Sequence, residues 1–344
     1  MAGVFPILFI APSRIGDAVL ASGLVKRLAD EIPNAGFTVA AGPASAPLFR
    51  DLPGLQKLLV VEKEAGGGHW IKIWRQTRSR RWGLIVDMRG SALSGMLSAR
   101  KKAIHKRKDG AEAVHKVREA AHVLNLADDP PAPHIFVSEA TQASADTLLG
   151  LDKHPGAPIL AMGPAANWTG KAWAAERFAV VAAKLLDKDG PMANGRLLLL
   201  GGPEDKETAR TVKHAVPRPR VIDLTGGADL LIGFAALKRA RLYIGNDSGL
   251  MHMAAAAGTP TLGLFGPSDE RLYAPWGTYA RALRGPRDFE TFKRLDPGLN
   301  QPLSHMSDLS VESVLNAAKR LHAETEGVVR QQAAGSRQQE ESLP

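Results

Sequence analysis

Short apolar runs alternate along the chain with longer segments in which apolar residues recur every three or four positions. The first five apolar runs have the length of buried strands and cover residues 7–12, 37–42, 57–62, 84–90 and 101–106. Helical periodicity fills two of the gaps between them, at 17–32 and 69–82. Strands that alternate with helices in this way imply right-handed crossovers and a parallel sheet.

A second series of the same kind follows a Pro-rich stretch at 127–135, a helix predicted near 138–150 and an exposed linker at 151–158. Its predicted strands are 158–164, 197–202, 221–226, 242–245 and 261–266. Its predicted helices are 174–190, 204–216, 228–240, the segment that begins at Ser248, and 311–326. The pattern predicts an α/β chain of two Rossmann-like, doubly wound domains that face each other across a cleft.

We place the N-terminal domain at 1–152 and the C-terminal domain at 153–325. Residues 326–344 have almost no apolar content and are predicted to form a disordered tail. A length of 344 residues suits two domains, and 44% hydrophobic with 23% charged residues is typical of a soluble globular protein. Cysteine is absent, which excludes disulfides and thiolate metal sites. The first apolar run is interpreted as a strand rather than a signal peptide, and no run reaches the roughly 18 residues of a membrane span, so we expect a cytoplasmic protein.

The net charge of +9 is concentrated in one stretch. Between Arg100 and Arg118 there are eight basic and two acidic residues. This run is either a solvated basic face or a site for a polyanion, such as a phosphorylated membrane surface or an acidic sugar. It contains no aromatic residue, so it offers no stacking platform for single-stranded nucleic acid, and we expect no nucleic-acid partner.

Ligands of open α/β sheets bind beyond the carboxyl ends of the strands, which directs attention to the segment GNDSGLMH at 245–252. Here a strand leads into a helix whose first backbone N–H groups and dipole form an anion site. Gly249 would let a phosphate approach without a Cβ in the way, and His252 could donate to a phosphate or ribose oxygen. The alternative is that Asp247 or Ser248 merely caps the helix and His252 packs in a core.

Two other strand ends carry single charges. Lys171, in NWTGKAW, is outside any Walker loop because Ala172 stands where Ser or Thr would bind magnesium. It is interpreted either as a lone surface lysine or as a bare cation that neutralises a diphosphate without a metal. Asp17, in APSRIGDAV, follows the first strand, where only Gly16 of a dinucleotide fingerprint is present, which argues against a nicotinamide enzyme. Asp17 either complements the helix dipole or acts as a general base across the cleft.

Five motifs together resemble glycosyltransferase family 9, the bacterial heptosyltransferases of lipopolysaccharide core assembly, over roughly residues 6–323. They are RIGDAVLASGLVKRL, DMRG at 87–90, TGKAW at 169–173, GGPEDKETA at 201–209 and GNDSGLMHMAAAAGTPTLGLFGP. The resemblance implies the GT-B arrangement, with the acceptor in the domain 1–152 and the sugar nucleotide in the domain 153–325. It also implies inverting, metal-independent transfer of a heptose or related sugar from an ADP-sugar to an acidic lipopolysaccharide core acceptor, without a cofactor.

The resemblance also implies roles for particular residues. Asp17 would be the catalytic carboxylate. The donor would be bound by Lys171, Asp205, Asp247, Ser248, Gly249 and His252, where Asp205 is ranked first among Glu204, Asp205 and Glu207 for contact with the ribose. The acceptor would face Arg14, Arg89, Lys101 and Lys102, by domain position alone.

One departure weakens the identification of the donor sugar: Ala165, Ala166 and Asn167 stand where the family carries hydroxyl residues before the lysine. Two alternatives stay open, a sugar-nucleotide epimerase of the same fold and a non-enzymatic polyanion-binding protein. The basic run argues against the epimerase, and the second alternative leaves Asp17 and the turn at 247–252 unexplained. Under the preferred hypothesis the partners are a nucleotide sugar, a lipid-linked acidic saccharide and, peripherally, the cytoplasmic face of the inner membrane.

Overall fold

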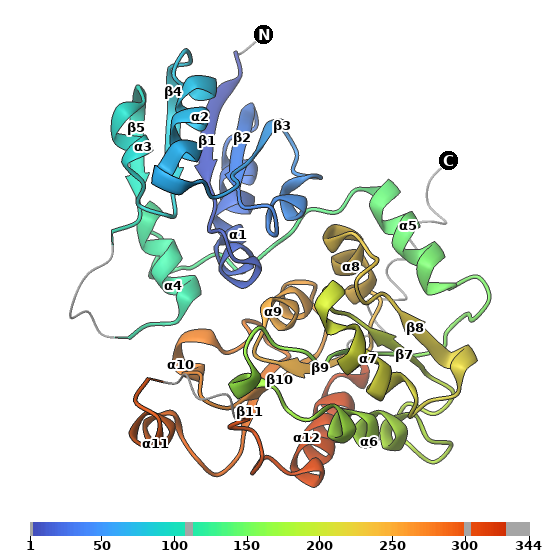
Figure 1. Ribbon diagram of the computed structural model, residues 1–344. Helices are drawn as coiled ribbons and strands as arrows, with labels where there is room; N and C mark the ends of the chain where they lie inside the picture. The colour runs from blue at the N-terminus through green and yellow to red at the C-terminus, as the bar shows by residue number, and fades with distance from the viewer. Residues whose placement is uncertain (1–2, 107–112, 299–303, 328–344) are drawn as a thin grey trace.

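The computed structural model describes residues 3–106, 113–298 and 304–327, and these form two α/β domains, each built on a fully parallel sheet (Figure 1). The predicted fold is therefore confirmed. The central part of the basic run, at 107–112, lies outside the described residues, as does nearly all of the predicted tail. None of the described helices is long and apolar enough to cross a membrane.

The first sheet has the strand order β3-β2-β1-β4-β5. Its strands are β1 (Phe5–Ile10), β2 (Ala35–Ala41), β3 (Leu55–Val60), β4 (Trp82–Asp87) and β5 (Ala99–Ile104). The helices that accompany it are α1 (Ile15–Glu31), α2 (Gly68–Thr77), α3 (Ala92–Met96) and α4 (Lys116–Ala121). Side chains alternate between the two faces of a strand, so Phe9 packs with Leu24 of α1, while Leu8 packs with Ile73 of α2 and Leu93 of α3.

The second sheet has the order β11-β10-β9-β6-β7-β8. Its strands are β6 (Ile159–Gly163), β7 (Arg196–Leu199), β8 (Val221–Asp223), β9 (Leu242–Asn246), β10 (Thr261–Phe265) and β11 (Ala280–Arg284). Its helices are α6 (Ala175–Leu186), α7 (Lys206–Lys213), α8 (Leu230–Leu237), α9 (Gly249–Ala256), α10 (Glu270–Tyr273), α11 (Phe289–Leu295) and α12 (Val311–Glu324). The sequence analysis missed β11, because this edge strand reads ARALR and lacks an apolar run.

Short 3₁₀ helices occupy several connections: η1 (Ala46–Phe49), η2 (Ala65–Gly67), η3 (His122–Leu124), η4 (Thr169–Lys171), η5 (Pro203–Asp205) and η6 (Arg218–Arg220). The helix predicted near 138–150 is α5 (Glu139–Leu149), which packs on α8 (Figure 1). There Arg239 of the second domain pairs with Asp146 at 2.7 Å. The boundary placed at residues 152 and 153 stays a prediction.

The two domains meet where the amino end of α1 packs against α9. Two glycines form this contact: a Cβ on Gly249 would lie 2.8 Å from Ile15 Cγ2, and one on Gly16 would lie 3.1 Å from the ring of His252. A second bridge joins Arg50 of the first domain to Asp229 of the second at 2.9 Å. The contact brings together the strand ends at which both sheets are expected to bind ligands.

A candidate active site between the two domains

Asp17 faces a pocket at the domain boundary. It is the third residue of α1, and its side chain lines a pocket of about 220 Å³ together with Met88, His105, Lys116, Glu119 and Tyr273, among others. Burial raises the pKa of Asp17 above its usual value, and the positive charges of Arg14 and Lys116 act in the opposite direction. A carboxylate with a raised pKa is a stronger base than an ordinary aspartate.

The same pocket contains a group of charged side chains that follow β5 or lie on α4. His105 Nε2 lies 3.1 Å from Glu119 Oε1, and Lys116 forms an ion pair with the same carboxylate. The hydrogen bond from His105, followed by that from Lys116, lowers the pKa of Glu119 to about 2 against the effect of burial. Glu119 is therefore ionised throughout the physiological range, and its negative charge contributes to the raised pKa of Asp17.

The second domain closes this pocket with residues that follow β10. Tyr273 lines the pocket, and Lys116 Nζ lies 5.8 Å from the centroid of its ring. Next to it, His115 Nε2 lies 2.9 Å from the carbonyl oxygen of Ala274, and the His115 ring packs 4.8 Å from Trp276. His115 Nδ1 accepts a hydrogen bond from the Val117 amide at the start of α4, so the neutral ring carries its proton on Nε2 and donates to Ala274.

A polar network holds the segment that bears Lys171 against the end of β9. Asn246 accepts a hydrogen bond from the Trp173 amide and donates to the carbonyl of Pro164. Lys171 Nζ lies 2.7 Å from Asp247 Oδ2, and Asp247 is only 6% exposed. The interpretation of Lys171 as a bare cation is thus wrong for this structure, because its charge is paired with a buried carboxylate.

The amino end of α9 displays polar groups without partners. Ser248 occupies the N-cap position but makes no side-chain cap hydrogen bond, so it does not cap the helix through its side chain. Its Oγ faces the Tyr243 hydroxyl without completing a hydrogen bond to it. Nδ1 of His252 and Oγ of Ser268 are likewise buried without a hydrogen-bond partner in the described part of the chain. These residues follow β9 and β10 at the carboxyl end of the sheet, and buried polar atoms of this kind call for a partner.

One detail of this turn corrects the sequence interpretation, and a second defines the protonation state of His252. The space beside the Gly249 Cα is filled by Ile15 and the amide of Gly16, so in this structure it is not an open approach for phosphate. His252 is 4% exposed, and burial lowers its pKa to about 4, so its imidazole is neutral at pH 7. A neutral imidazole can donate through one nitrogen and accept through the other, but it adds no positive charge.

The site therefore combines the Asp17 carboxylate of the first domain with the Lys171 amine and the amino end of α9 of the second domain. The family model for glycosyltransferase family 9 (heptosyltransferase) matches residues 71–298, which is more than half of the chain. The chain belongs to glycosyltransferase family 9.

Relatives of known name support the same assignment. Lipooligosaccharide heptosyltransferase 2 of Haemophilus influenzae is 25% identical over 81% of this chain and 88% of its own length. Lipopolysaccharide heptosyltransferase 2 of Escherichia coli is 23% identical, over 90% and 97% respectively. The solved structure of Escherichia coli ADP-heptose lps heptosyltransferase II has the same fold, with a TM-score of 0.73 at 22% identity over 93% of this chain and 99% of that one. The protein is a glycosyltransferase with the GT-B fold.

The acidic residues after β7 in this family 9 protein differ in their surroundings. The Asp205 carboxylate accepts a hydrogen bond of 2.7 Å from the Gly202 amide and so closes its own turn, and burial raises its pKa. Glu207 is exposed and pairs with Arg210 at 2.7 Å. Asp205 lies at the carboxyl end of the sheet, and its contact with a ribose stays a prediction.

The four basic residues assigned to the acceptor do not gather at Asp17. Arg14 is exposed at the N-cap of α1, near enough for its charge to act on Asp17. Arg89 is half-buried, and its guanidinium lies 4.7 Å from the centroid of the Trp70 ring. Lys101 and Lys102 are exposed along the edge strand β5, where Lys102 donates to the Gly95 carbonyl, and neither lines the pocket.

The basic run is also divided in space, because its described parts lie on β5 and α4. Sequence reasoning treated Lys116 only as one charge of this run and did not single out His105, Glu119, His115 or Tyr273. The position of His115 and Lys116 at the start of α4 is a signal that could have found them, but no helix is predicted there from the sequence. Tyr273 offered no signal, because the two domains must meet before it reaches the pocket.

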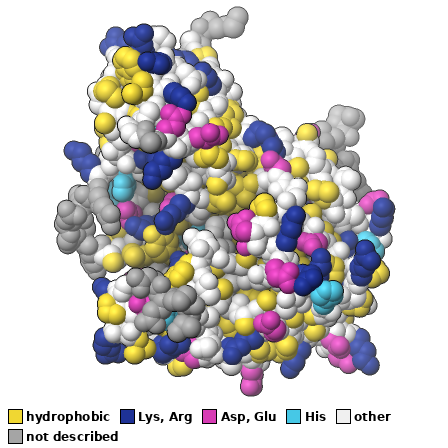
Figure 2. Space-filling model, viewed as in Figure 1, with side chains coloured by type: hydrophobic (Ala, Val, Ile, Leu, Met, Phe, Trp, Pro, Cys, Tyr) yellow, Lys and Arg dark blue, Asp and Glu magenta, His cyan; other side chains and the backbone are white. Residues whose placement is uncertain are grey.

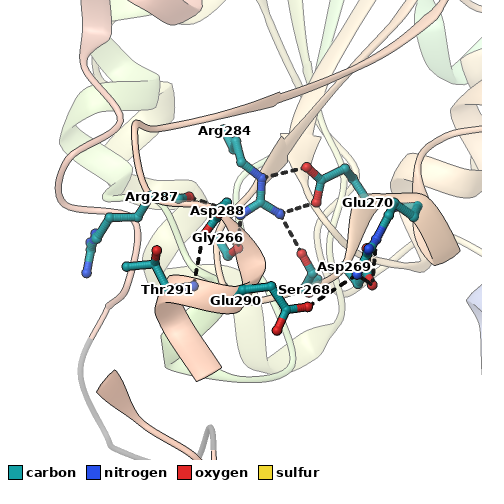
Figure 3. Close-up of polar contacts among 10 residues, drawn as sticks. Gly266, Ser268, Asp269, Glu270, Arg284, Arg287, Asp288, Glu290 and Thr291 are labelled. Carbon is teal, nitrogen blue, oxygen red and sulfur yellow. Dashed lines mark hydrogen bonds and ion pairs between the residues drawn. The ribbon is translucent and has the colours of Figure 1, made fainter. Parts of the chain in front are cut away.

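Arg284 organises the loop that leads from β10 through Ser268 to Glu270 (Figure 3). Arg284, at the end of β11, is 15% exposed, and its guanidinium donates to the carbonyls of Gly266 at 3.0 Å and Ser268 at 2.7 Å. It also pairs with Glu270 at the start of α10, with Nε 2.8 Å from Oε1. These bonds fix the path from β10 to α10 and thereby the position of Tyr273 at the pocket.

Proposed function

We propose that this glycosyltransferase moves a heptose or related sugar from an ADP-sugar to an acidic lipopolysaccharide core acceptor, with inversion at the anomeric carbon. The observation that carries the proposal is the contact of α1 with α9, which brings the start of the helix that bears Asp17 against Gly249 and within range of the charge of Lys171. In the reaction, Asp17 takes the proton of the acceptor hydroxyl as its oxygen bonds to the anomeric carbon. The bond from that carbon to the diphosphate breaks on the opposite face, and ADP leaves.

The donor is proposed to lie over the amino end of α9. The unpaired amides of the first turn, with the hydroxyl of Ser248, would stabilise charge that develops on the leaving diphosphate. Lys171 would share its charge between Asp247 and the phosphate oxygens. The neutral ring of His252 would supply a hydrogen bond through the nitrogen that has no partner here. The ADP-heptose assignment is supported by the names of the relatives, whereas Ala165, Ala166 and Asn167 argue for testing other nucleotide sugars.

We propose that transfer proceeds without a metal ion. In the described residues, no three His, Asp or Glu side chains form a group that could hold a metal. Lys171 and the helix N-terminus would then provide the positive potential at the diphosphate. The acceptor is proposed to be linked to lipid and to reach the first domain from the cytoplasmic face of the inner membrane.

A panel of nucleotides tests the donor assignment. ADP and ADP-heptose should raise the melting temperature, because a ligand that binds the folded state stabilises it by mass action. UDP and GDP should do so less, and EDTA should leave the shift unchanged. If no nucleoside diphosphate shifts the transition, the donor site is wrong.

A product assay with and without acceptor tests the reaction. Release of ADP should require a core oligosaccharide, and the new linkage should have the opposite anomeric configuration to the donor. Conversion of the donor sugar to another isomer without any acceptor would instead establish the epimerase alternative.

A further inference from the structure

We propose that the face formed by α2, α3 and the first half of β5 docks the N-terminal domain onto an anionic lipid bilayer. The inference rests on the proposed lipid-linked acceptor, and it adds the outer side of α2 and α3 to the basic residues of β5 and Arg89 that the resemblance already places near the acceptor. Three independent features of this face support it: exposed apolar side chains, unpaired basic side chains, and tryptophans covered by arginines.

The apolar feature comes from α2 and α3. Helix α2 turns His69, Ile73 and Thr77 toward the domain, which leaves Ile71 on the outer side with 54% of its surface exposed. Met96, the last residue of the neighbouring α3, is 61% exposed. The free energy of binding becomes more favourable when large exposed apolar side chains of two adjacent helices enter the interfacial region of a membrane.

Basic side chains surround these two residues. They are Lys72, Arg75, Arg78, Arg80 and Arg81 of the α2 segment and Arg100, Lys101 and Lys102 of β5. Only Lys72 has a carboxylate partner among the described residues, Glu64, and there is no acidic residue from 68 to 82. Figure 2 shows hydrophobic side chains bordered by Lys and Arg at the end of the N-terminal domain, over the region that α3, β4 and β5 occupy in Figure 1.

Two half-buried tryptophans of α2 lie under arginines along the same face. The guanidinium of Arg78 lies 4.8 Å from the Trp74 ring, and that of Arg89 lies over the Trp70 ring. Tryptophan with an apolar body and a polar edge is the residue type enriched at membrane interfaces. The two rings are half-buried and covered by the guanidinium groups, so they do not offer the open faces on which nucleic-acid bases stack.

The face continues into the active-site pocket. Met88 lines the pocket beside Asp17, and the next residue, Arg89, packs on Trp70 at the amino end of α2. An acceptor whose lipid stays in the bilayer would therefore reach Asp17 along a surface already held against the headgroups. The charge favours an anionic bilayer, since each basic side chain near such a surface strengthens binding by roughly fivefold.

Co-sedimentation of the full chain with vesicles tests the inference. Vesicles of phosphatidylglycerol with phosphatidylcholine should bind the protein, phosphatidylcholine alone should bind it weakly, and salt should weaken the binding. The triple variant Arg75→Gln, Arg78→Gln, Arg81→Gln should lose on the order of tenfold or more in affinity. The double variant Ile71→Ser, Met96→Ser should also bind vesicles less well. Lysine in place of Arg75, Arg78 and Arg81 should keep binding near the wild-type level, because it keeps the positive charge.

A matched control removes three exposed basic residues of the second domain, Arg218→Gln, Lys319→Gln and Arg320→Gln, and should bind vesicles like the wild type. Equal losses of vesicle affinity in the two triple variants would mean that the protein adsorbs through its net charge, and this result would overturn the docking face. The docking face would also be overturned if the Ile71→Ser, Met96→Ser variant bound vesicles like the wild type and the wild type bound an oligonucleotide as strongly as vesicles. That result would indicate a general polyanion site.

Transfer to a water-soluble, delipidated acceptor separates this inference from the proposed function. Wild-type turnover of that acceptor without vesicle binding would reject the docking face and keep the function. Vesicle binding that depends on these side chains, without transfer to any core acceptor, would reject the function and keep the docking face.

Discussion

Asp17 combines two properties that a general base needs, access to a pocket and a raised pKa. We expect Asp17→Asn to keep the fold and the thermal shift with ADP while lowering kcat roughly 10²-fold or more, the usual scale for loss of a general base. Asp30→Asn, at the other end of α1, is the matched control, because Asp30 is exposed and its ion pair within the described part of the chain is with Lys26. Near-normal turnover of Asp17→Asn would show that this carboxylate stabilises the helix dipole of α1 and is not the general base.

Glu119 is one of several charges that act on Asp17. Burial is the main cause of the raised pKa of Asp17, the negative charge of Glu119 adds to it, and removal of Glu119 would also release Lys116, whose charge lowers that pKa. In Glu119→Gln the acid limb of kcat/KM should therefore move to lower pH, since Asp17 would stay ionised at lower pH. The measurement is the pH profile of kcat/KM. The control is Glu64→Gln, which breaks the ion pair of Glu64 with Lys72 and should leave the profile unchanged. A shift to higher pH would contradict the argument.

At the scale of elements, the contact between α1 and α9 depends on glycine. Gly249→Ala would place a methyl group 2.8 Å from Ile15 Cγ2, and overpacking of this kind costs about 1–3 kcal/mol. We expect a lower melting temperature and slower transfer, with partial recovery on adding Ile15→Ala. Gly233→Ala in α8 is the control, because its methyl group would lie at an ordinary 3.5 Å from Leu200. If Gly249→Ala behaved like the control, the tight contact would not hold in solution.

The loop between β10 and α10 depends on Arg284. Arg284→Ala leaves the carbonyls of Gly266 and Ser268 and the Glu270 carboxylate without their donor, so we expect a loss of about 2 kcal/mol in unfolding free energy. Because Tyr273 would lose its fixed position, KM for the acceptor should rise more than KM for the donor. Arg281→Ala, on the exposed side of the same strand, should change neither. Equal changes in both KM values would indicate a general loss of structure.

At the scale of the whole molecule, His115 joins α4 to the second domain. His115→Asn keeps an N-cap residue for α4 but removes the bond to Ala274 and the ring contact with Trp276. It should therefore melt near the wild-type temperature and show a higher acceptor KM. His115→Phe keeps the ring contact and loses the cap, so it should be destabilised by about 1 kcal/mol. An unchanged acceptor KM in His115→Asn would show that this bridge does not shape the pocket.

The sequence by itself determined the architecture and the strand ends that bear the site. Apolar strands alternate with amphipathic helices, and this local periodicity is enough to predict two parallel sheets. The same rule placed Asp17, Lys171 and the turn from Asp247 to His252 at carboxyl ends of strands. It failed for β11, which reads ARALR without an apolar run, and for the helices α3, α4, α10 and α11, which are too short to show a clear apolar period.

Only the tertiary structure decided what those residues contact. The pairing of Lys171 with Asp247, the contact of Ile15 with Gly249 and the position of Tyr273 beside Asp17 join segments far apart in the chain. The sequence shows the excess of basic residues but not where each of them lies. In the structure Lys116 pairs with Glu119 in the pocket, whereas the lysines of β5 are exposed at the surface. Charge partners and burial are properties of the packed chain, and no local pattern contains them.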